Sequence, residues 1–291
     1  MAQKLPLKTY RGNCHCSAFV YTFEAPEIKT VHECNCSICY KKGYLWVRPS
    51  PDTFVVVQGS EEALTTYTFS TGTTLHKFCP TCATPLMGVK TATPPEMRRL
   101  VNAHAIQGIN TRELQRLPFN GAALEPSYAS PRHSGEEPSA VIENASLYYG
   151  SCHCGAVTLA FKSQLLDKNY PGAVSECNCS SCERNASIWV YPKREQVVIR
   201  GEENMGKYYF GTKSIAKTFC KKCGINLTNA AAELDEGEIA ALDGNFRGLH
   251  ALAKSLTPFN LRVLNGFHIS EVKDVVQRVS GPEDGVPYVS P

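Results

Sequence analysis

The chain has 291 residues, of which 43% are hydrophobic and 20% charged, and its formal net charge is +3. This length allows two domains that each bury a core, and no apolar run approaches the roughly 18 residues of a membrane span. The small charge disfavours a nucleic-acid-binding protein, despite a modest basic cluster at Lys213, Lys217, Lys221 and Lys222. The N-terminus lacks the apolar region of a signal peptide, so we expect a cytoplasmic protein, with the nucleus as the alternative.

Short runs rich in β-branched and aromatic residues indicate strands along the whole chain. They cover residues 18–23, 44–47, 54–57 and 65–69 in the first half, and 156–161, 187–191, 196–199 and 207–210 in the second. Helical patterns are scarce. Leu249–Leu256 predicts two helical turns, and Thr111–Leu117 is its weaker counterpart in the first half. The sequence therefore predicts an all-β protein.

The order of the cysteines indicates that the second half repeats the first. Each half carries seven cysteines in the order C-x-C, C-x-C-x-x-C and C-x-x-C. Trp46 matches Trp189, and Pro118-Phe119-Asn120 matches Pro258-Phe259-Asn260. These matches predict a tandem duplication with a first domain over residues 1–122, a linker over 123–144, a second domain over 145–279 and a tail over 280–291.

The outer cysteine pairs of each copy have the spacing of a closed zinc site. A C-x-C near the start of a domain and a C-x-x-C near its end offer the four sulfur ligands that tetrahedral zinc requires. Disulfide pairing is the alternative, which a reducing cytosol disfavours. We expect two structural sites that staple distant strands together, with the ligands Cys14, Cys16, Cys79 and Cys82 in the first copy and Cys152, Cys154, Cys220 and Cys223 in the second.

A cluster of three cysteines lies at the centre of each copy, in ECNCSIC at residues 33–39 and ECNCSSC at 176–182. Crowded thiolates repel one another unless a cation neutralises them, and three sulfurs on a tetrahedral ion leave one position open for a substrate. The alternative is a closed zinc that takes a fourth ligand from His15, His153, His32 or His76. The expected ligands of the central sites are Cys34, Cys36 and Cys39, and Cys177, Cys179 and Cys182, which brings the total to about two zinc ions per domain.

The order CHC, CNCSxC and FCxxC resembles the glutathione-dependent formaldehyde-activating (GFA) enzyme family, and in particular its members related to centromere protein V. The resemblance covers almost all of both halves, including TTYTFSTGTTLHKFC in the first and KTFCKKCG in the second. It implies tandem zinc-binding β-tent domains, each built of small antiparallel sheets and stapled by the four-cysteine zinc. It also implies a carbon–sulfur lyase that forms or cleaves S-hydroxymethylglutathione. Ser17 and Ala83 replace glycines usual in the family, and Ile225-Asn226-Leu227 replaces the string seen at Thr84-Pro85-Leu86, so the two copies need not bind the same ligand.

The predicted reaction joins a thiol and an aldehyde to a hemithioacetal, or reverses this step, with glutathione as ligand or co-substrate. Zinc with an open position can hold the thiol as thiolate and act as a Lewis acid. His104 is a candidate acid/base, and the repeat places it opposite Gly244, beside Asp243. Candidate glutathione-binding residues are Trp46 and Trp189 as pocket walls, and Lys41, Lys42 and Arg184 as partners for its carboxylates. The alternative function is a non-catalytic zinc-stapled binding module that associates with chromatin.

Overall fold

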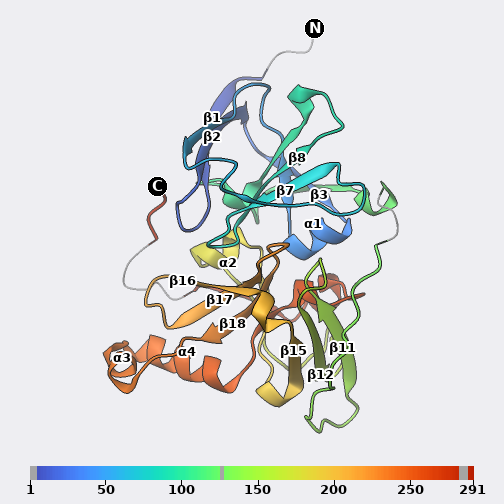
Figure 1. Cartoon of the computed structure of the whole chain (residues 1–291), viewed down its shortest axis with the longest axis vertical. Helices are drawn as coiled ribbons and strands as arrows, with labels where there is room; N and C mark the ends of the chain where they lie inside the picture. The colour runs from blue at the N-terminus through green and yellow to red at the C-terminus, as the bar shows by residue number, and fades with distance from the viewer. Residues whose placement is uncertain (1–4, 125–127, 282–287) are drawn as a thin grey trace. The chain divides into compact units, whose positions relative to one another are not determined.

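The computed structural model describes residues 5–124, 128–281 and 288–291 (Figure 1). These residues form two compact units, and each unit contains one three-stranded and one seven-stranded sheet. In the described part of the chain, no helix is both long and apolar enough to cross a membrane. The predominance of strands confirms the all-β prediction. The two units repeat the same order of strands, which confirms the duplication.

The first unit begins with a three-stranded sheet in the order β1-β2-β5 and continues into a seven-stranded sheet in the order β10-β3-β4-β9-β8-β7-β6. Its elements are β1 (Leu7–Asn13), β2 (Val20–Pro26), β3 (Thr30–Cys34), α1 (Ser37–Lys42), β4 (Leu45–Val47), β5 (Val55–Gln58), β6 (Thr65–Tyr67), β7 (Thr74–Phe78), β8 (Pro85–Lys90), η1 (Pro95–Met97), β9 (Arg99–Asn102), η2 (Ala103–Ala105), β10 (Gln115–Phe119) and η3 (Gly121–Leu124).

The second unit has the three-stranded order β11-β12-β15 and the seven-stranded order β16-β17-β18-β19-β14-β13-β20. Its elements are β11 (Ser146–Ser151), β12 (Thr158–Ser163), β13 (Val174–Cys177), α2 (Ser180–Arg184), β14 (Ile188–Val190), η4 (Arg194–Gln196), β15 (Val197–Arg200), η5 (Glu202–Asn204), β16 (Met205–Tyr209), β17 (Ile215–Cys220), β18 (Asn226–Ala231), α3 (Glu236–Ala241), α4 (Gly244–Ser255), β19 (Phe259–Asn260), η6 (Leu261–Val263), η7 (Ile269–Val272) and β20 (Val276–Val279).

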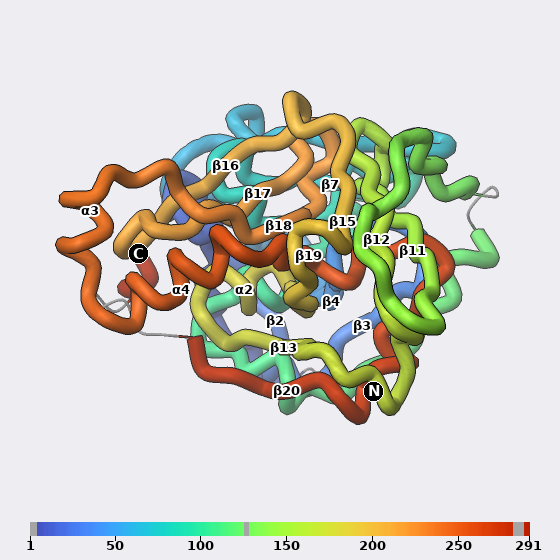
Figure 2. The backbone as a smooth tube through the Cα atoms, turned by 90° about the horizontal axis from the view of Figure 1, so that it is seen from below, coloured from blue at the N-terminus to red at the C-terminus, as the bar shows by residue number. Residues whose placement is uncertain are grey.

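One strand pair in each seven-stranded sheet is parallel, which the sequence did not predict. β10 pairs with β3 in parallel, and β20 pairs with β13 in the same way. Figure 2 shows β13 and β20 side by side. Each of these late strands returns to the strand that leads into the three-cysteine cluster. The segment Thr111–Leu117 is therefore not a helix: it forms a turn and the first residues of β10.

The core of each unit is formed by side chains that alternate along the strands. In β2, Tyr21, Phe23 and Ala25 are buried, while the residues between them remain partly exposed, as expected for a strand with one face against a core. In the second unit, Phe161 of β12 packs edge-on against Phe259 of β19, with ring centroids 5.1 Å apart. This contact joins the two sheets of that unit.

The second copy contains a helical insertion. The strand pairing around it shows that part of the sequence match between the two copies was wrong. The helices α3 and α4 lie between β18 and β19, where the first copy has only η1, so the predicted helix at 249–256 is part of the longer α4. Asn102 pairs opposite Trp46 and Asn260 opposite Trp189, so Asn260 corresponds to Asn102 rather than to Asn120. Matching Pro118-Phe119-Asn120 to residues 258–260 was therefore wrong.

The predicted linker packs against the second unit over much of its length. The Ala140 N–H donates to the Glu195 carbonyl at 3.0 Å, and His133 Nδ1 lies 3.0 Å from Thr158 Oγ1. Residues 125–127 of the linker and 282–287 of the predicted tail lie outside the described residues. The boundaries drawn from the sequence stay predictions.

Candidate metal centres and the pockets beside them

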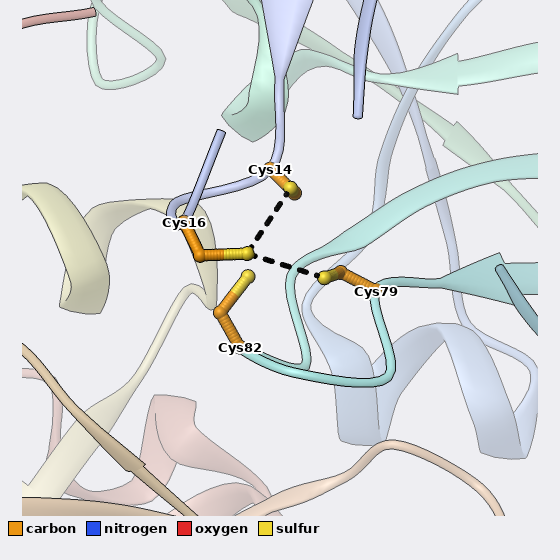
Figure 3. Close-up of side chains that lie close together, drawn as sticks. All are labelled: Cys14, Cys16, Cys79 and Cys82. Carbon is orange, nitrogen blue, oxygen red and sulfur yellow. Dashed lines mark hydrogen bonds between the residues drawn. The ribbon is translucent and has the colours of Figure 1, made fainter. Parts of the chain in front are cut away.

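Four cysteines of the first unit converge from two turns. Cys14 and Cys16 lie between β1 and β2, and Cys79 and Cys82 lie between β7 and β8. Figure 3 shows the four sulfurs gathered around one point; Cys16 Sγ is 3.6 Å from Cys14 Sγ and 3.5 Å from Cys79 Sγ. A disulfide requires about 2.05 Å, whereas a tetrahedron with zinc–sulfur bonds of 2.3 Å has edges of about 3.8 Å. The sulfur spacing therefore fits zinc.

The second unit repeats this arrangement with Cys152, Cys154, Cys220 and Cys223, whose ligand atoms all lie within 4.8 Å of one another. In each copy, an amide supports the first sulfur. The Phe19 N–H donates to Cys14 Sγ at 3.3 Å, and the Val157 N–H donates to Cys152 Sγ at 3.2 Å. Amide donors stabilise thiolates, which are the form that binds metal.

The three-cysteine clusters are built by a strand end and the first turn of a helix. Cys34 ends β3, Cys36 immediately precedes α1, and Cys39 lies in the helix. Residues three apart lie on one face of a helix, so Cys36 and Cys39 both point toward the strand end. Cys177, Cys179 and Cys182 have the same arrangement around β13 and α2. In both clusters the three sulfurs lie within 4.8 Å of one another.

Thiols in the first cluster have opposing pKa shifts because they share protons. Hydrogen bonds from the Cys36 and Cys39 thiols lower the pKa of Cys34 to about 3, while the bond to Cys34 raises the pKa of Cys36 to about 12. The same contact with Cys34 raises the pKa of Cys39 well above its usual value. The negative charge of one thiolate therefore disfavours ionisation of the neighbouring thiols, and a cation is needed before all three can ionise together.

Each cluster is covered by a glycine that sequence reasoning missed. A Cβ on Gly121 would overlap Cys34 Sγ, and a Cβ on Gly281 would overlap Cys179 Cβ. The Gly121 amide also lowers the pKa of Cys34 through a backbone hydrogen bond, although the Cys36 and Cys39 thiols lower this pKa more strongly. Both glycines follow the parallel strand at the sheet edge. The sequence signal is weak, because only the three-dimensional return of β10 and β20 brings them to the cysteines.

An indole contacts each cluster. Trp46 Nε1 donates to Cys39 Sγ at 3.3 Å, and Trp189 Nε1 donates to Cys182 Sγ at 3.2 Å. Both tryptophans line a pocket beside their cluster, and their contact with glutathione stays a prediction. Each indole therefore combines a pocket wall with a hydrogen bond to a candidate metal ligand, and such bonds orient ligands and tune their basicity.

The pocket of the first copy has a volume of about 400 Å³. The three cysteines form part of its lining, together with Trp46 and His76. Its remaining lining residues are His32, Arg48, Phe69, Ser70, Thr71, Thr73, Thr74, Lys90, Ala92, Thr93, Leu100, Phe119, Gly121 and Leu124. Two fixed cations, Arg48 and Lys90, thus face a space that ends at the cysteine cluster.

The pocket of the second copy is smaller, about 170 Å³, and is covered by the inserted helix. It is lined by Cys177, Cys179, Cys182, Trp189, Tyr191, Phe210, Thr212, Ser214, Ile215, Lys217, Asn229, Phe246, Leu249, Leu252, Ala253 and Pro258. Lys217 Nζ lies 3.4 Å from Cys182 Sγ and 4.9 Å from the centroid of the Trp189 ring. Lys217 is therefore a pocket residue, a role that its place in the basic cluster of the sequence did not predict.

Several predicted site residues lie away from these pockets. Lys41, Lys42 and Arg184 line neither pocket, and Lys42 Nζ lies over the Phe78 ring at 4.5 Å. His104 also lies outside the first pocket, with Nδ1 3.4 Å from Thr111 Oγ1.

The structure also corrects the residues expected opposite His104. Asp243 accepts hydrogen bonds from the Asn245 and Phe246 amides and caps α4. With Asn102 matched to Asn260, the counterpart of His104 is Arg262 rather than Gly244.

Among the histidines considered as a fourth metal ligand, His32 and His76 line the first pocket. His15 and His153 are buried beside the four-cysteine sites. Within the described residues, the four groups that could hold a metal ion consist of cysteines alone.

Two segments of the chain, residues 9–108 and 147–259, match the family model described as glutathione-dependent formaldehyde-activating enzyme. A crystal structure of a Rhodobacter sphaeroides protein, a structural genomics target, is 31% identical in sequence. The similarity covers 37% of this chain and 97% of that chain, with a TM-score of 0.33. The two matched segments fall one in each copy, and each contains all seven cysteines of its copy.

Proposed function

Because the chain belongs to the glutathione-dependent formaldehyde-activating enzyme family, we propose that it is a carbon–sulfur lyase that forms or cleaves hemithioacetals of glutathione. The observation that carries this proposal is the pocket of the first copy. It ends at three convergent cysteines that, among the described residues, no histidine or carboxylate joins as a fourth ligand, and its rim carries Arg48 and Lys90. A pocket that joins a soft metal site to fixed cations suits a small thiol with carboxylates.

We propose four zinc ions per chain, one in each cysteine cluster. The sulfur spacing of the four-cysteine sites supports a bound cation, and so do the three-cysteine sites, where three sulfurs lie within 4.8 Å of one another. Zinc in a three-cysteine cluster supplies a Lewis acid that keeps a nearby thiol deprotonated. Elemental analysis of protein prepared without chelator should give about four zinc ions per chain. A value near zero, with disulfides present, contradicts the metal assignment.

The chain's own residues orient the two reactants. Arg48 and Lys90 bind the carboxylates of glutathione, because guanidinium and ammonium groups form charge-assisted hydrogen bonds to carboxylates. Trp46 forms one wall of the pocket and restricts the thiol to the end of the pocket where the cysteines lie. These residues replace Lys41, Lys42 and Arg184 as the proposed partners of the tripeptide.

Proton transfer in the first copy is assigned to His76. It lines the pocket and packs against Trp46 and Tyr44, with ring centroids 6.4 and 5.7 Å apart. In the synthetic direction, the thiolate sulfur forms a bond to the aldehyde carbon, the C=O π pair moves to oxygen, and His76 donates the proton that completes the hydroxyl. In the reverse direction, His76 takes this proton back as the C–S bond breaks.

An exchange assay tests the proposed reaction directly. Glutathione and formaldehyde also form their adduct without a catalyst, and NMR exchange spectroscopy measures how fast free glutathione and the adduct interconvert. The protein should accelerate this exchange in both directions, and His76→Gln should slow it while leaving glutathione binding intact. If the wild-type protein binds glutathione but leaves the exchange rate unchanged, the alternative of a non-catalytic zinc-stapled module is correct. The cytoplasmic location stays a prediction.

A further inference from the structure

Equivalent positions of the two pockets differ in charge, although the cysteine clusters beside them are alike. The strand registers align Lys90 with Ala231, because Lys90 pairs with Thr74 and Ala231 pairs with Ile215. Likewise, Tyr191 follows Trp189-Val190 at the position that Arg48 occupies after Trp46-Val47. Both cations proposed to bind the carboxylates of glutathione are therefore missing from the second pocket.

The inserted helix reduces the space of the second pocket and makes it apolar. Phe246, Leu249, Leu252 and Ala253 of α4 contribute to its lining, and the pocket volume is about 170 Å³, against about 400 Å³ in the first copy. Phe246 and Ala253 are buried, and His250 Nε2 lies 2.9 Å from the Ala232 carbonyl oxygen, which fixes the helix to the end of β18. The second pocket therefore offers a tripeptide less room than the first.

Lys217 supplies the positive charge of the second pocket, and its ammonium group already contacts the cysteine cluster. Among the described residues that line this pocket, it is the one with a fixed charge. Its ammonium group lies 3.4 Å from Cys182 Sγ and over the Trp189 ring. If the cluster holds a divalent ion, its three thiolates would leave a net charge of −1, which Lys217 would balance. A carboxylate entering this pocket would lose water without gaining a cation of its own, and this is costly.

A neighbouring amide oxygen points to the polar group that a ligand should carry. Asn229 lies directly opposite Lys217 in the β17–β18 pairing and lines the same pocket. Its Oδ1 is buried and accepts no hydrogen bond within the described residues. Buried acceptors without partners are costly, so a ligand with an uncharged hydroxyl donor is favoured here. The hydroxyl of a hemithioacetal is such a donor.

Resting on the function proposed above, we propose that the two pockets serve different ligands. The first binds the anionic tripeptide thiol and its adducts. The second rejects glutathione and binds a small, uncharged, apolar thiol or its hemithioacetal, with the sulfur at the cysteine cluster, the hydroxyl at Asn229 and the alkyl group against α4.

The chain has two tryptophans, one beside each cluster, so single-tryptophan variants report each pocket separately. Trp189→Phe leaves Trp46 to report the first pocket, and Trp46→Phe leaves Trp189 to report the second. Glutathione and butane-1-thiol are the probes, titrated into the zinc-loaded full chain. We expect glutathione to change Trp46 fluorescence at a concentration at least about tenfold below any effect on Trp189, because only the first pocket offers cations to its carboxylates. Butane-1-thiol should change both signals.

Arg48→Tyr tests whether the cation causes the difference in glutathione binding. It places in the first pocket the residue type that Tyr191 provides in the second. In the Trp189→Phe background it should weaken glutathione binding about tenfold and leave butane-1-thiol binding unchanged. Equal glutathione affinities of the two pockets would overturn the inference and leave the proposed function standing. If neither thiol changes the fluorescence of either tryptophan, both the proposed function and this inference fail.

A measurement on the wild-type chain guards against misfolded variants. In the cobalt-substituted protein, saturating glutathione should add about one sulfur ligand per chain, and butane-1-thiol about two, because each open tetrahedral position accepts one thiolate. Two glutathione thiolates per chain would overturn the inference.

Discussion

At the scale of single residues, the two copies place different residues in the same left-handed turn position. Ser17 has a φ of 62°, and Gly155 at the matching position of the second copy has a φ of 81°. Both residues follow the C-x-C turn of a four-cysteine site. A side chain in this left-handed conformation costs about 1–2 kcal/mol, which glycine avoids.

Ser17→Gly should therefore stabilise the first unit, by roughly 0.5–1 kcal/mol after allowing for the greater freedom of glycine in the unfolded chain. Urea denaturation of the zinc-loaded protein measures this change. Ser17→Ala is the matched control, because alanine keeps the Cβ atom and hence the left-handed penalty. Equal stabilisation by both substitutions would show that the backbone conformation is not the cause.

The glycines that cover the three-cysteine clusters allow a more specific prediction. Gly121→Ala should displace Cys34, because the new Cβ would overlap its sulfur, and zinc content should fall by about one ion per chain. Gly281→Ala should have the same effect on the second cluster. Gly248→Ala, at a helical position with open space around it, is the control and should keep the full zinc content. Unchanged zinc in the Gly121 variant would remove its proposed role.

At the scale of elements, the sequence predicted eight strands, because short runs of β-branched and aromatic residues favour strands. These strands are β2, β4, β5, β6, β12, β14, β15 and β16. The predicted runs at 44–47 and 187–191 contain β4 and β14, and the cysteine spacing predicted which thiols converge. The parallel strands β10 and β20 escaped prediction, because pairing between segments far apart in the chain leaves no local pattern.

The sequence also gave an incorrect alignment where α3 and α4 are inserted. The short motif Pro-Phe-Asn occurs in both copies at similar spacing, but Asn120 follows β10, whereas Asn260 lies in β19 beside Trp189. Chance identity therefore outweighed the true match to Asn102. Lys217 was noted only as a member of a basic cluster, whereas the register of β17 places it at the position of His76 in β7.

Asn102 and Asn260 have a shared structural role that supports their alignment. The Asn102 Oδ1 atom accepts from the Leu45 amide, and Asn260 Oδ1 accepts from the Ile188 amide, both at 3.3 Å. Each asparagine is buried and bonds the strand that carries the tryptophan of its pocket. We infer that this side chain fixes the position of the indole against the cysteine cluster.

At the scale of the whole molecule, the four-cysteine and three-cysteine sites should contribute differently to stability. The first kind joins turns that are distant in the chain, whereas the second lies within a single strand–helix connection. Cys79→Ser or Cys220→Ser should unfold its own unit, because zinc binding supplies much of the folding free energy of such domains. Cys36→Ser or Cys179→Ser should preserve the fold. Thermal melts followed by circular dichroism compare the four variants, and equally early melting in all of them would make the three-cysteine sites structural.

The central claim is that the metal in a three-cysteine cluster has a position open to a thiol, and cobalt substitution tests it most directly. Cobalt reports its sulfur ligands through a sulfur-to-metal charge-transfer band. A three-sulfur site completes its tetrahedron with an exchangeable ligand, whereas a four-sulfur site must first break a bond to the protein. Millimolar glutathione should therefore intensify the band of the wild-type protein, and Cys36→Ser should abolish the change. A wild-type spectrum that stays the same in millimolar glutathione, with no metal released, would contradict the account.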